Sequence, residues 1–101
     1  MKVFLDDVRD PPPEWVLVRT APEAIAKLKA GGVTHLSLDH DLGDDMAFGT
    51  GYDVLLWVEE AVALRGFAPP ALAVHSANPV GRQRMLQAIE SIERLLQGRQ
   101  R

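Results

Sequence analysis

The sequence predicts a small three-layer α/β domain built on a mainly parallel, four-stranded sheet. Short apolar runs alternate with amphipathic helical segments in the order β-β-α-β-α-β-α, and strands separated by helices are typical of parallel sheets with right-handed crossovers. The chain has 101 residues, of which 47% are hydrophobic, so we expect a single domain over residues 1–101 with a modest core.

The first two strands are predicted at residues 2–5 and 15–19. The run from Lys2 to Leu5 is apolar and rich in β-formers without alternation, as in a strand buried on both faces of a parallel sheet. Between the two runs lies the segment 11–13, which is three prolines. Proline favours extended polyproline geometry and cannot start a fully bonded long helix, so we expect a stiff loop here.

A helix is predicted to follow the second strand. Thr20 is its N-cap, Glu23 completes a capping box, and Pro22 is tolerated in the first turn. Two consecutive glycines at 31–32 end this helix. The third strand, 35–38, then runs into an acidic loop.

The C-terminal half repeats this logic. A second helix is predicted from Thr50 through about Leu64, by a threonine cap and apolar residues at helical spacing. The fourth strand is expected at 71–74. The last helix begins at Asn78, because asparagine is a good cap and the proline after it suits the first helical position. Residues 97–101 are expected to fray.

Composition excludes several classes of function. The chain has no cysteine, which rules out disulfides, thiolate metal sites and cysteine nucleophiles, and makes a cytoplasmic protein the default expectation. The net charge is -3 without a basic stretch, so we expect no extended nucleic-acid face, although one or two arginines can bind a phosphorylated RNA end or small molecule. An apolar run of about 18 residues, as a membrane span needs, is absent from the sequence.

Aspartates gather directly after two of the predicted strands. Asp6 and Asp7 follow the first strand, and Asp39 and Asp41 follow the third. In open α/β sheets the carboxyl ends of the strands form the ligand-binding edge. Repulsion among so many carboxylates must be offset, and a divalent cation does so most simply. We therefore expect Asp6, Asp7 and Asp39 to serve as ligands of Mg²⁺ or Mn²⁺, and Asp41 to add either a further carboxylate or a loop carbonyl.

The same edge carries two candidates for proton transfer. His40 follows Asp39 directly, and His75 follows the fourth strand. Histidine changes its charge near neutral pH, so both are predicted to act as acid or base, with Asp39 as metal ligand, nucleophile towards phosphorus, or both. His35 begins its strand about 13 Å from Asp39 and is given no catalytic role.

Residues after the first and fourth strands are suited to binding phosphate. Ser76 offers a hydroxyl and a backbone amide, and Asn78 caps a helix whose N-terminus attracts anions. Arg82 lies in that helix's first turn, where the macrodipole disfavours a cation unless an anion binds there. Arg9 follows the first acidic pair and is predicted to clamp the same anion or neutralise nearby aspartates.

These residues together resemble the response-regulator receiver domain. Asp6-Asp7, Asp39 and Ser76 stand where that family binds Mg²⁺, accepts a phosphoryl group and contacts it, respectively. Receivers also carry a lysine after a fifth strand. The lysines of this chain are Lys2, Lys27 and Lys29, none of which follows a predicted strand.

The chain is more similar to a receiver-derived family, the cyclic-phosphate processing receiver domain. The motifs that carry this resemblance are Leu5-Asp6-Asp7-Val8-Arg9 with Pro11-Pro12, Ser37-Leu38-Asp39-His40-Asp41-Leu42-Gly43, Thr50-Gly51-Tyr52-Asp53, and His75-Ser76-Ala77-Asn78-Pro79-Val80-Gly81. The resemblance implies a truncated flavodoxin- or receiver-like sheet with strand order 2-1-3-4. It also implies a role in handling cyclic phosphate ends in a setting of RNA repair, which suggests metal-dependent opening of a 2′,3′-cyclic phosphate.

Other functions fit parts of the same pattern. A non-catalytic phosphoacceptor or phosphate-binding signalling module needs only the receiver-like site. The D-x-D spacing of Asp39 and Asp41 after a strand also occurs in haloacid-dehalogenase-like phosphatases. A calcium-binding EF-hand loop fits less well, because Asp44 stands where that loop needs glycine. A homodimer that caps one sheet edge is also expected, with the face around Trp57 as a contact.

Overall fold

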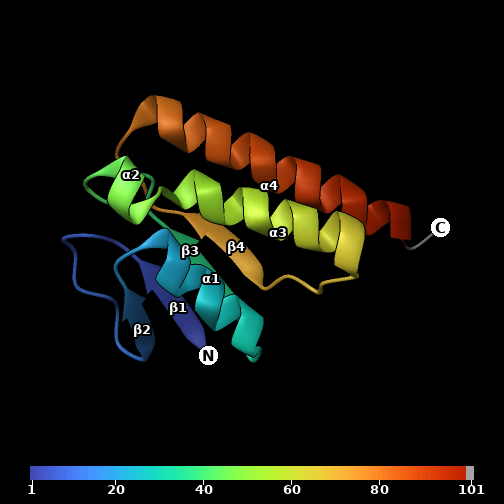
Figure 1. Ribbon diagram of the computed structural model, residues 1–101, viewed down its shortest axis with the longest axis horizontal. Coiled ribbons are helices and arrows are strands. Elements are labelled where there is room, and N and C mark those ends of the chain that lie inside the picture. Colours follow the sequence, from blue (N-terminus) through green and yellow to red (C-terminus); the bar gives the residue numbers. More distant parts are fainter. Residues whose placement is uncertain (100–101) are drawn as a thin grey trace.

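In the computed structural model, which describes residues 1–99, four strands form one sheet. They are β1 (Lys2–Leu5), β2 (Trp15–Val18), β3 (His35–Leu38) and β4 (Ala71–Val74). The strand order is β2-β1-β3-β4 and every neighbouring pair is parallel, which confirms the predicted sheet (Figure 1). The pairing is in register across the sheet, so the carboxyl ends of all four strands lie along the same edge.

Four helices complete the described part of the chain. They are α1 (Ala21–Ala30), α2 (Asp45–Phe48), α3 (Gly51–Arg65) and α4 (Pro79–Arg99). The short helix α2 was not predicted. Helix α4 remains helical through Arg99, so the expected fraying at residues 97–99 was wrong, and the rest of that prediction lies outside the described residues. Within residues 1–99, no helix combines the length and apolarity needed to cross a membrane.

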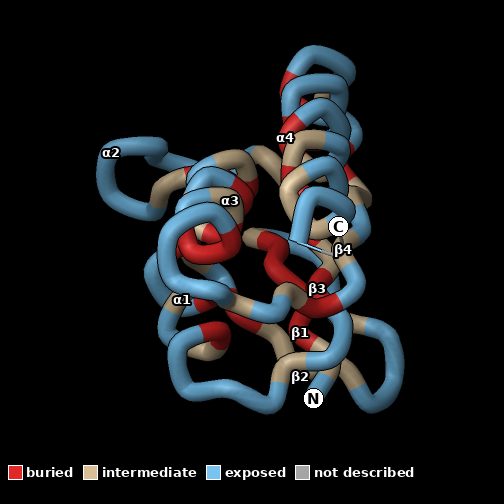
Figure 2. Tube along the Cα trace, turned by 90° about the vertical axis from the view of Figure 1, so that its right-hand side faces the viewer, coloured by how far each residue is buried: buried red, intermediate tan, exposed pale blue. Residues whose placement is uncertain are grey.

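The helices lie on one side of the sheet, which corrects the prediction of three layers. Helix α3 packs between α1 and α4, and α4 continues this row beside the edge strand β4 (Figure 1). In the view turned by 90°, α1 and α3 stand on one side of the strands, and α4 lies beyond the edge strand β4 (Figure 2). Both helical crossovers step across the sheet in the same direction, and right-handed crossovers then place their helices on the same face.

The connection from β1 to β2 explains the missing layer. It contains the three prolines and forms a loop instead of a helix. The opposite face of the sheet carries aromatic side chains that pack on one another. The Phe4 ring stacks on His75 with a centroid distance of 4.2 Å, and Trp15 meets the same phenylalanine edge-on at 6.2 Å.

The core lies between the sheet and the helices. Its largest fully buried side chains include Leu5, Leu36, Leu38, Leu55, Met85 and Ile92. At the edge of this core, α3 begins with the predicted capping box between Thr50 and Asp53. A Cβ atom on Gly51 would lie 2.0 Å from the backbone oxygen of Asp39. The first turn of α3 therefore presses directly on the loop that follows β3, and fixes its position.

Candidate metal and phosphate site

Three aspartates converge at the carboxyl edge of the sheet, as the sequence predicts. Asp6, Asp7 and Asp39 each offer a carboxylate oxygen, and these oxygens all lie within 4.8 Å of one another. Asp6 is buried, whereas the other two are partly exposed and open the group to solvent. This spacing and this donor type suit Mg²⁺, a hard cation that takes oxygen ligands and retains some of its waters.

Asp6 is the buried anchor of this group. Its Oδ1 accepts hydrogen bonds from the backbone amides of Val8 (2.9 Å) and Arg9 (2.8 Å). Burial by itself would raise the pKa of Asp6, but these amides and His75 outweigh it and hold the pKa below its ordinary value. Asp6 therefore stays ionised at neutral pH even though its side chain is fully buried.

Asp39 lies in the opposite electrostatic situation. Burial and the charge of Asp6 raise the pKa of Asp39 above its ordinary value, while the His40 amide and the Ser76 hydroxyl partly oppose them. The His40 amide donates to Oδ1 of Asp39 at 2.8 Å. Two neighbouring carboxylates that repel each other, one of them deeply buried, form a site whose free energy a bound cation lowers.

His75 holds Asp6 in place. Its Nε2 lies 3.0 Å from Oδ2 of Asp6, and its Nδ1 lies 2.7 Å from the Ser37 hydroxyl. An ionised carboxylate only accepts hydrogen bonds, so Nε2 carries a proton, and in the neutral ring the Ser37 hydroxyl donates to Nδ1. With both ring nitrogens engaged and one ring face on Phe4, His75 is arranged to position Asp6. The sequence offered one signal for Ser37, a polar residue between two leucines of β3.

His40 forms a second pair with a carboxylate. Its Nδ1 lies 2.8 Å from Oδ1 of Asp41, and this hydrogen bond lowers the pKa of Asp41. The ring packs on the first turn of α4, where a Cβ on Gly81 would approach ring atoms to between 2.5 and 2.9 Å. Asn78 also contacts Asp41, at 3.3 and 3.4 Å. Among the described residues, Asp41 is not part of the three-aspartate group, so it orients His40 in this structure.

The start of α4 lies beside these pairs. Asn78 caps the helix as predicted, with its Oδ1 accepting the amide of Gly81 at 3.1 Å. The buried Ser76 hydroxyl accepts the Asn78 amide at 3.1 Å and lowers the pKa of Asp39, whose larger influences are burial and Asp6. Ser76 thus connects the helix start to the aspartate group.

Three arginines lie around the site, and one of them, Arg19, was not a predicted site residue. Arg9 donates from Nη1 to the carbonyl of His75 at 3.2 Å, which brings its guanidinium across the site. Arg82 donates to the carbonyl of Val74 at 3.3 Å, towards the edge strand. The third is Arg19, whose Nη1 donates to the carbonyl of Asp6 at 3.2 Å. Its signal was its place at the carboxyl end of the second strand.

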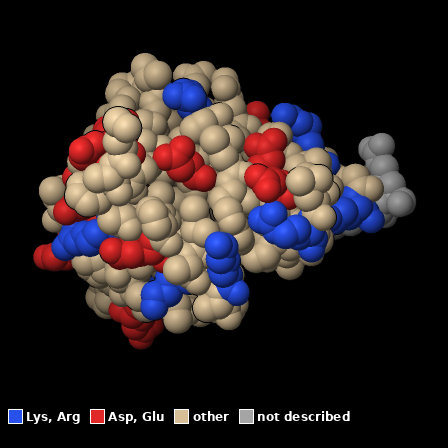
Figure 3. All heavy atoms as spheres, viewed as in Figure 1, with Lys and Arg blue, Asp and Glu red and all other residues tan. Residues whose placement is uncertain are grey.

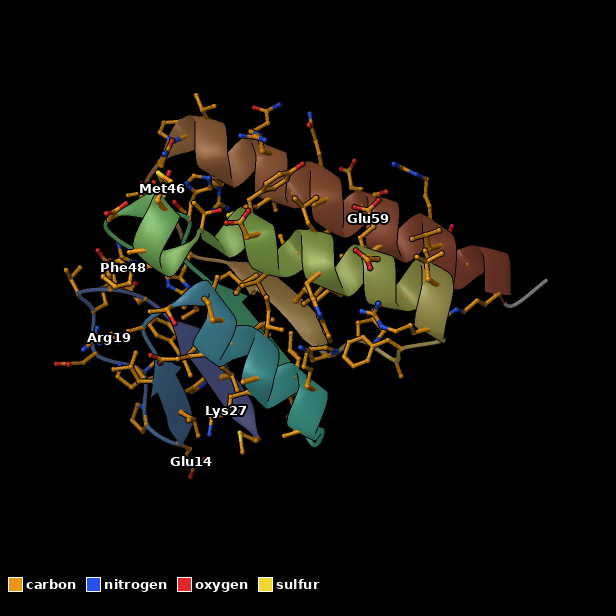
Figure 4. The ribbon with its side chains drawn as sticks, in the orientation of Figure 1. Glu14, Arg19, Lys27, Met46, Phe48 and Glu59 are labelled. Carbon is orange, nitrogen blue, oxygen red and sulfur yellow. The ribbon has the colours of Figure 1, made fainter. Side chains whose placement is uncertain are left out.

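A cavity of about 250 Å³ opens beside the aspartate group. It is lined by Asp7, Arg19, Thr20, Leu42 and Phe48. Arg19 and Phe48 lie close to each other at one end of the molecule, from the end of β2 and from α2 (Figure 4). Phe48 was not a predicted site residue, because its helix was expected to be loop. On the face shown in Figure 3, Lys and Arg side chains are interspersed with Asp and Glu.

The comparisons with known proteins agree with this arrangement. The model of the cyclic-phosphate processing receiver domain matches residues 1–91. A search of curated proteins and a search of solved structures each found no match. The match includes all four strands, the aspartate group and the start of α4. The chain therefore belongs to the cyclic-phosphate processing receiver domain family and has an α/β receiver-like fold.

Proposed function

We propose that this domain opens a 2′,3′-cyclic phosphate on a nucleotide or RNA end, with the help of Mg²⁺ or Mn²⁺. The observation that carries the proposal is the group formed by Asp6, Asp7 and Asp39, whose carboxylate oxygens lie within 4.8 Å of one another. The family's association with cyclic-phosphate processing supports the choice of substrate.

The three aspartates would hold the cation. Bound there, Mg²⁺ or Mn²⁺ would neutralise charge on the phosphate and lower the pKa of an attacking water. The donor set fits this ion, because hard carboxylate oxygens suit it. Burial and the charge of Asp6 raise the pKa of Asp39, and a dication would relieve the repulsion between the two carboxylates. Positioning of Asp6 by His75 resembles the outer-shell hydrogen bonds that orient metal ligands.

His40 is the better placed of the two histidines for proton transfer. Its Nδ1 is held by Asp41, which leaves Nε2 for the reaction, whereas both nitrogens of His75 have protein partners. In the proposed hydrolysis, water forms a bond to phosphorus and gives a proton to Nε2 of His40. One of the two ester P–O bonds breaks, and the leaving oxygen takes a proton back from the same nitrogen.

The phosphate oxygens would be held by the polar rim. Arg9 brings its guanidinium across the site to the His75 carbonyl, and Ser76 contacts both the aspartate group and the α4 start. Asn78 and Arg82 stay candidates at the N-terminal turn of α4, where backbone amides favour an anion. Such donors stabilise charge that develops on phosphorus in the transition state.

The test is turnover of nucleoside 2′,3′-cyclic phosphates by the folded protein with Mg²⁺ or Mn²⁺. We expect turnover that is lost with EDTA and with Asp39→Asn, which removes a carboxylate ligand of the cation. His40→Gln should reduce turnover at least 100-fold, since general acid–base groups contribute about 10²–10⁴-fold. Asp10→Asn is the matched control, an exposed aspartate on the same loop as Asp7. If correctly folded protein turns over no cyclic phosphate with any divalent metal, the proposal is wrong.

A phosphoacceptor module is the second candidate, because Asp39 is partly exposed beside Asp6 and Ser76. The lysine that receivers use is not at this site, since Lys2 lies over Trp15 and the other two lysines belong to α1. Stable modification of Asp39 by acetyl phosphate or beryllofluoride, without turnover, would favour this candidate. The haloacid-dehalogenase reading has less support, because Asp41 contacts His40 and Asn78 and stands apart from Asp39's group.

The setting of the reaction is also part of the proposal. We infer a cytoplasmic domain from the lack of cysteine, and an action on RNA ends or free nucleotides in RNA repair from the setting that the resemblance implies. A homodimer stays a prediction. Trp57, its expected contact, packs edge-on against Phe67 at 5.4 Å within the same chain, with the Arg65 guanidinium over its ring. Sedimentation at several concentrations tests it.

A further inference from the structure

We propose that the cavity beside Asp7 binds the terminal nucleoside of the substrate, one base with its ribose. This inference rests on the proposed function, because it assigns the part of the substrate that does not react. The cavity is lined by Asp7, Arg19, Thr20, Leu42 and Phe48. We refer to it as the nucleoside cavity.

The position of the cavity places its occupant next to the reacting phosphate. Asp7 lines the cavity and also belongs to the three-aspartate group. Arg19, on the cavity wall, donates to the backbone carbonyl of Asp6 at 3.2 Å. A nucleoside bound in the cavity therefore lies close enough to the aspartates for its own phosphate to be held there. A ribose that carries a 2′,3′-cyclic phosphate requires this proximity.

The size of the cavity sets a limit on the occupant. Its volume is about 250 Å³. Pockets that enclose drug-sized ligands measure about 300–1,000 Å³. The cavity is therefore suited to a single nucleoside whose sugar extends towards the aspartates, and too small for a second nucleotide.

The chemistry of the walls favours a planar ring. Leu42 is 3% exposed and forms the apolar floor of the cavity, whereas Phe48 is 40% exposed and forms an aromatic wall. The guanidinium of Arg19 is a second planar group, and both kinds of side chain stack on bases. Thr20 accepts the Glu23 amide with its hydroxyl oxygen, so its hydroxyl hydrogen can donate to a base edge or a ribose oxygen. Inorganic phosphate alone would make no use of the apolar walls.

One edge of the Phe48 ring lies against the loop that precedes α2. A Cβ placed on Gly43 would contact the Phe48 ring at 3.4 and 3.5 Å, so the loop before α2 supports one part of the ring. Phe48 lies on the side of α2 towards Arg19, and Met46 lies on the other side (Figure 4). Met46 is 98% exposed. The same short helix thus provides a test residue and a matched control.

The experiment compares two substrates that share a strained phosphate ring. One is a nucleoside 2′,3′-cyclic phosphate, and the other is ethylene phosphate, which has neither base nor sugar. In Phe48→Ala we expect KM for the nucleoside substrate to rise about tenfold, the effect of losing one base–aromatic stacking contact. Its kcat, and both constants for ethylene phosphate, should stay unchanged. Met46→Ala should change none of them.

A second readout does not depend on activity. Nucleoside 3′-monophosphate is titrated into the ¹⁵N-labelled protein without metal, and amide shifts are followed by NMR. We expect the largest shifts at Thr20 and Phe48, and their loss in Phe48→Ala. Such shifts without any turnover would support the cavity while refuting the proposed reaction. Turnover of both substrates, with KM unaffected by Phe48→Ala and no amide shifts, would refute the cavity alone.

The same assay distinguishes the two sources of a terminal nucleoside. A short RNA ending in a 2′,3′-cyclic phosphate is compared with the mononucleotide. A lower KM for the RNA identifies RNA ends as the substrate, and a lower KM for the mononucleotide identifies free nucleotides. Either result supports the cavity if Phe48→Ala raises that KM, and contradicts it if Phe48→Ala has no effect.

Discussion

At the scale of single residues, the site depends on how one buried charge is satisfied. Asp6 is 0% exposed, and its two oxygens accept from two backbone amides and from His75. An unpaired charge in that position would cost several kcal/mol, and these contacts together offset that cost. Asp39 lies nearby with its pKa raised by burial and by Asp6. The two aspartates therefore respond to pH and to substitution in opposite directions.

Asp6 is predicted to stabilise the metal-free fold above about pH 4. Its pKa is below the ordinary 3.8. A carboxylate with a depressed pKa contributes stability that is present above the unfolded pKa and is lost as the pH falls through the folded pKa. Asp6→Asn should cost about 1.5–3 kcal/mol at pH 7, as for a hydrogen bond to a charged group, and less at pH 3. Urea unfolding at both pH values measures this. A difference that does not shrink in acid would contradict it.

Asp39→Asn is predicted to stabilise the metal-free protein. The raised pKa means that folding disfavours the charged carboxylate, and this cost is present above the folded pKa and disappears as the pH falls below the unfolded pKa. The neutral isostere removes it and should gain about 1 kcal/mol at pH 7, a typical size for one substitution. Thermal unfolding with and without Mg²⁺ measures both effects. The wild type should gain Tm with Mg²⁺, and Asp39→Asn should not. Asp10→Asn should behave like the wild type.

At the scale of elements, two helix starts hold the loops of the site. Gly51 lets the first turn of α3 touch the backbone of Asp39, and Gly81 lets the first turn of α4 lie against the His40 ring. Both glycines are buried. Neither glycine is needed for a left-handed backbone, since only others have positive φ. They are required by the close approach of a helix to a functional loop.

Gly81→Ala is predicted to displace His40. The added Cβ would lie between 2.5 and 2.9 Å from three ring atoms, too close for the ring to stay in place. Overpacking of this kind costs about 1–3 kcal/mol, and the proposed turnover should fall with it. Gly98→Ala, in the same helix with nothing within 4 Å, is the control and should gain up to about 1 kcal/mol from helix propensity. Equal effects of the two substitutions would contradict this reading.

The loop before β2 is predicted to be under backbone strain. Glu14 has a φ of 73°, a left-handed conformation that costs an ordinary residue about 1–2 kcal/mol. Asparagine tolerates this conformation better, so Glu14→Asn should stabilise the protein by about 0.5–1 kcal/mol. Glu14→Gln removes the same charge without easing the left-handed backbone, and so controls for the loss of charge. The midpoint of denaturant unfolding measures both. A lower midpoint in Glu14→Asn would contradict the prediction.

The elements that the sequence predicts correctly have local signals. The caps at Thr20, Thr50 and Asn78 bond to amides three residues ahead, so short sequence patterns contain them. Helix α2 has only four residues in a polar loop, and no apolar periodicity identifies so short a helix. The number of layers depends on which side each crossover takes. Both helical crossovers step in the same direction and so place their helices on one face, while the proline loop leaves the other face without a helix.

At the scale of the whole molecule, the parallel sheet brings distant residues to one edge. The three aspartates were predictable as a group because each follows a strand. Their supporting contacts were not, since His75 reaches Ser37 and Asp6 across 38 and 69 residues of sequence. The role of Asp41 also depends on the direction of a side chain, which the position after a strand does not determine.

The face without helices is predicted to contribute strongly to stability. Phe4 is 8% exposed there, packed by Trp15 and His75. Phe4→Ala should cost about 3–5 kcal/mol, the usual range for a buried phenylalanine. Leu17→Ala, on the edge strand and only partly buried, should cost clearly less. Denaturant unfolding compares the two. Similar costs would mean that this face does not pack as a unit.

The stacking of His75 on Phe4 also gives the molecule an internal magnetic reporter. The two rings are nearly parallel, at an interplanar angle of 3°. The circulating π electrons of Phe4 shield protons above its plane, so the carbon-bound protons of His75 should resonate upfield of those of a free imidazole. A cation that binds Asp6 also changes the hydrogen bond between Asp6 and Nε2 of His75, and with it the resonances of the His75 protons. Occupancy of the aspartates can thus be followed from two imidazole resonances, without substituting any residue.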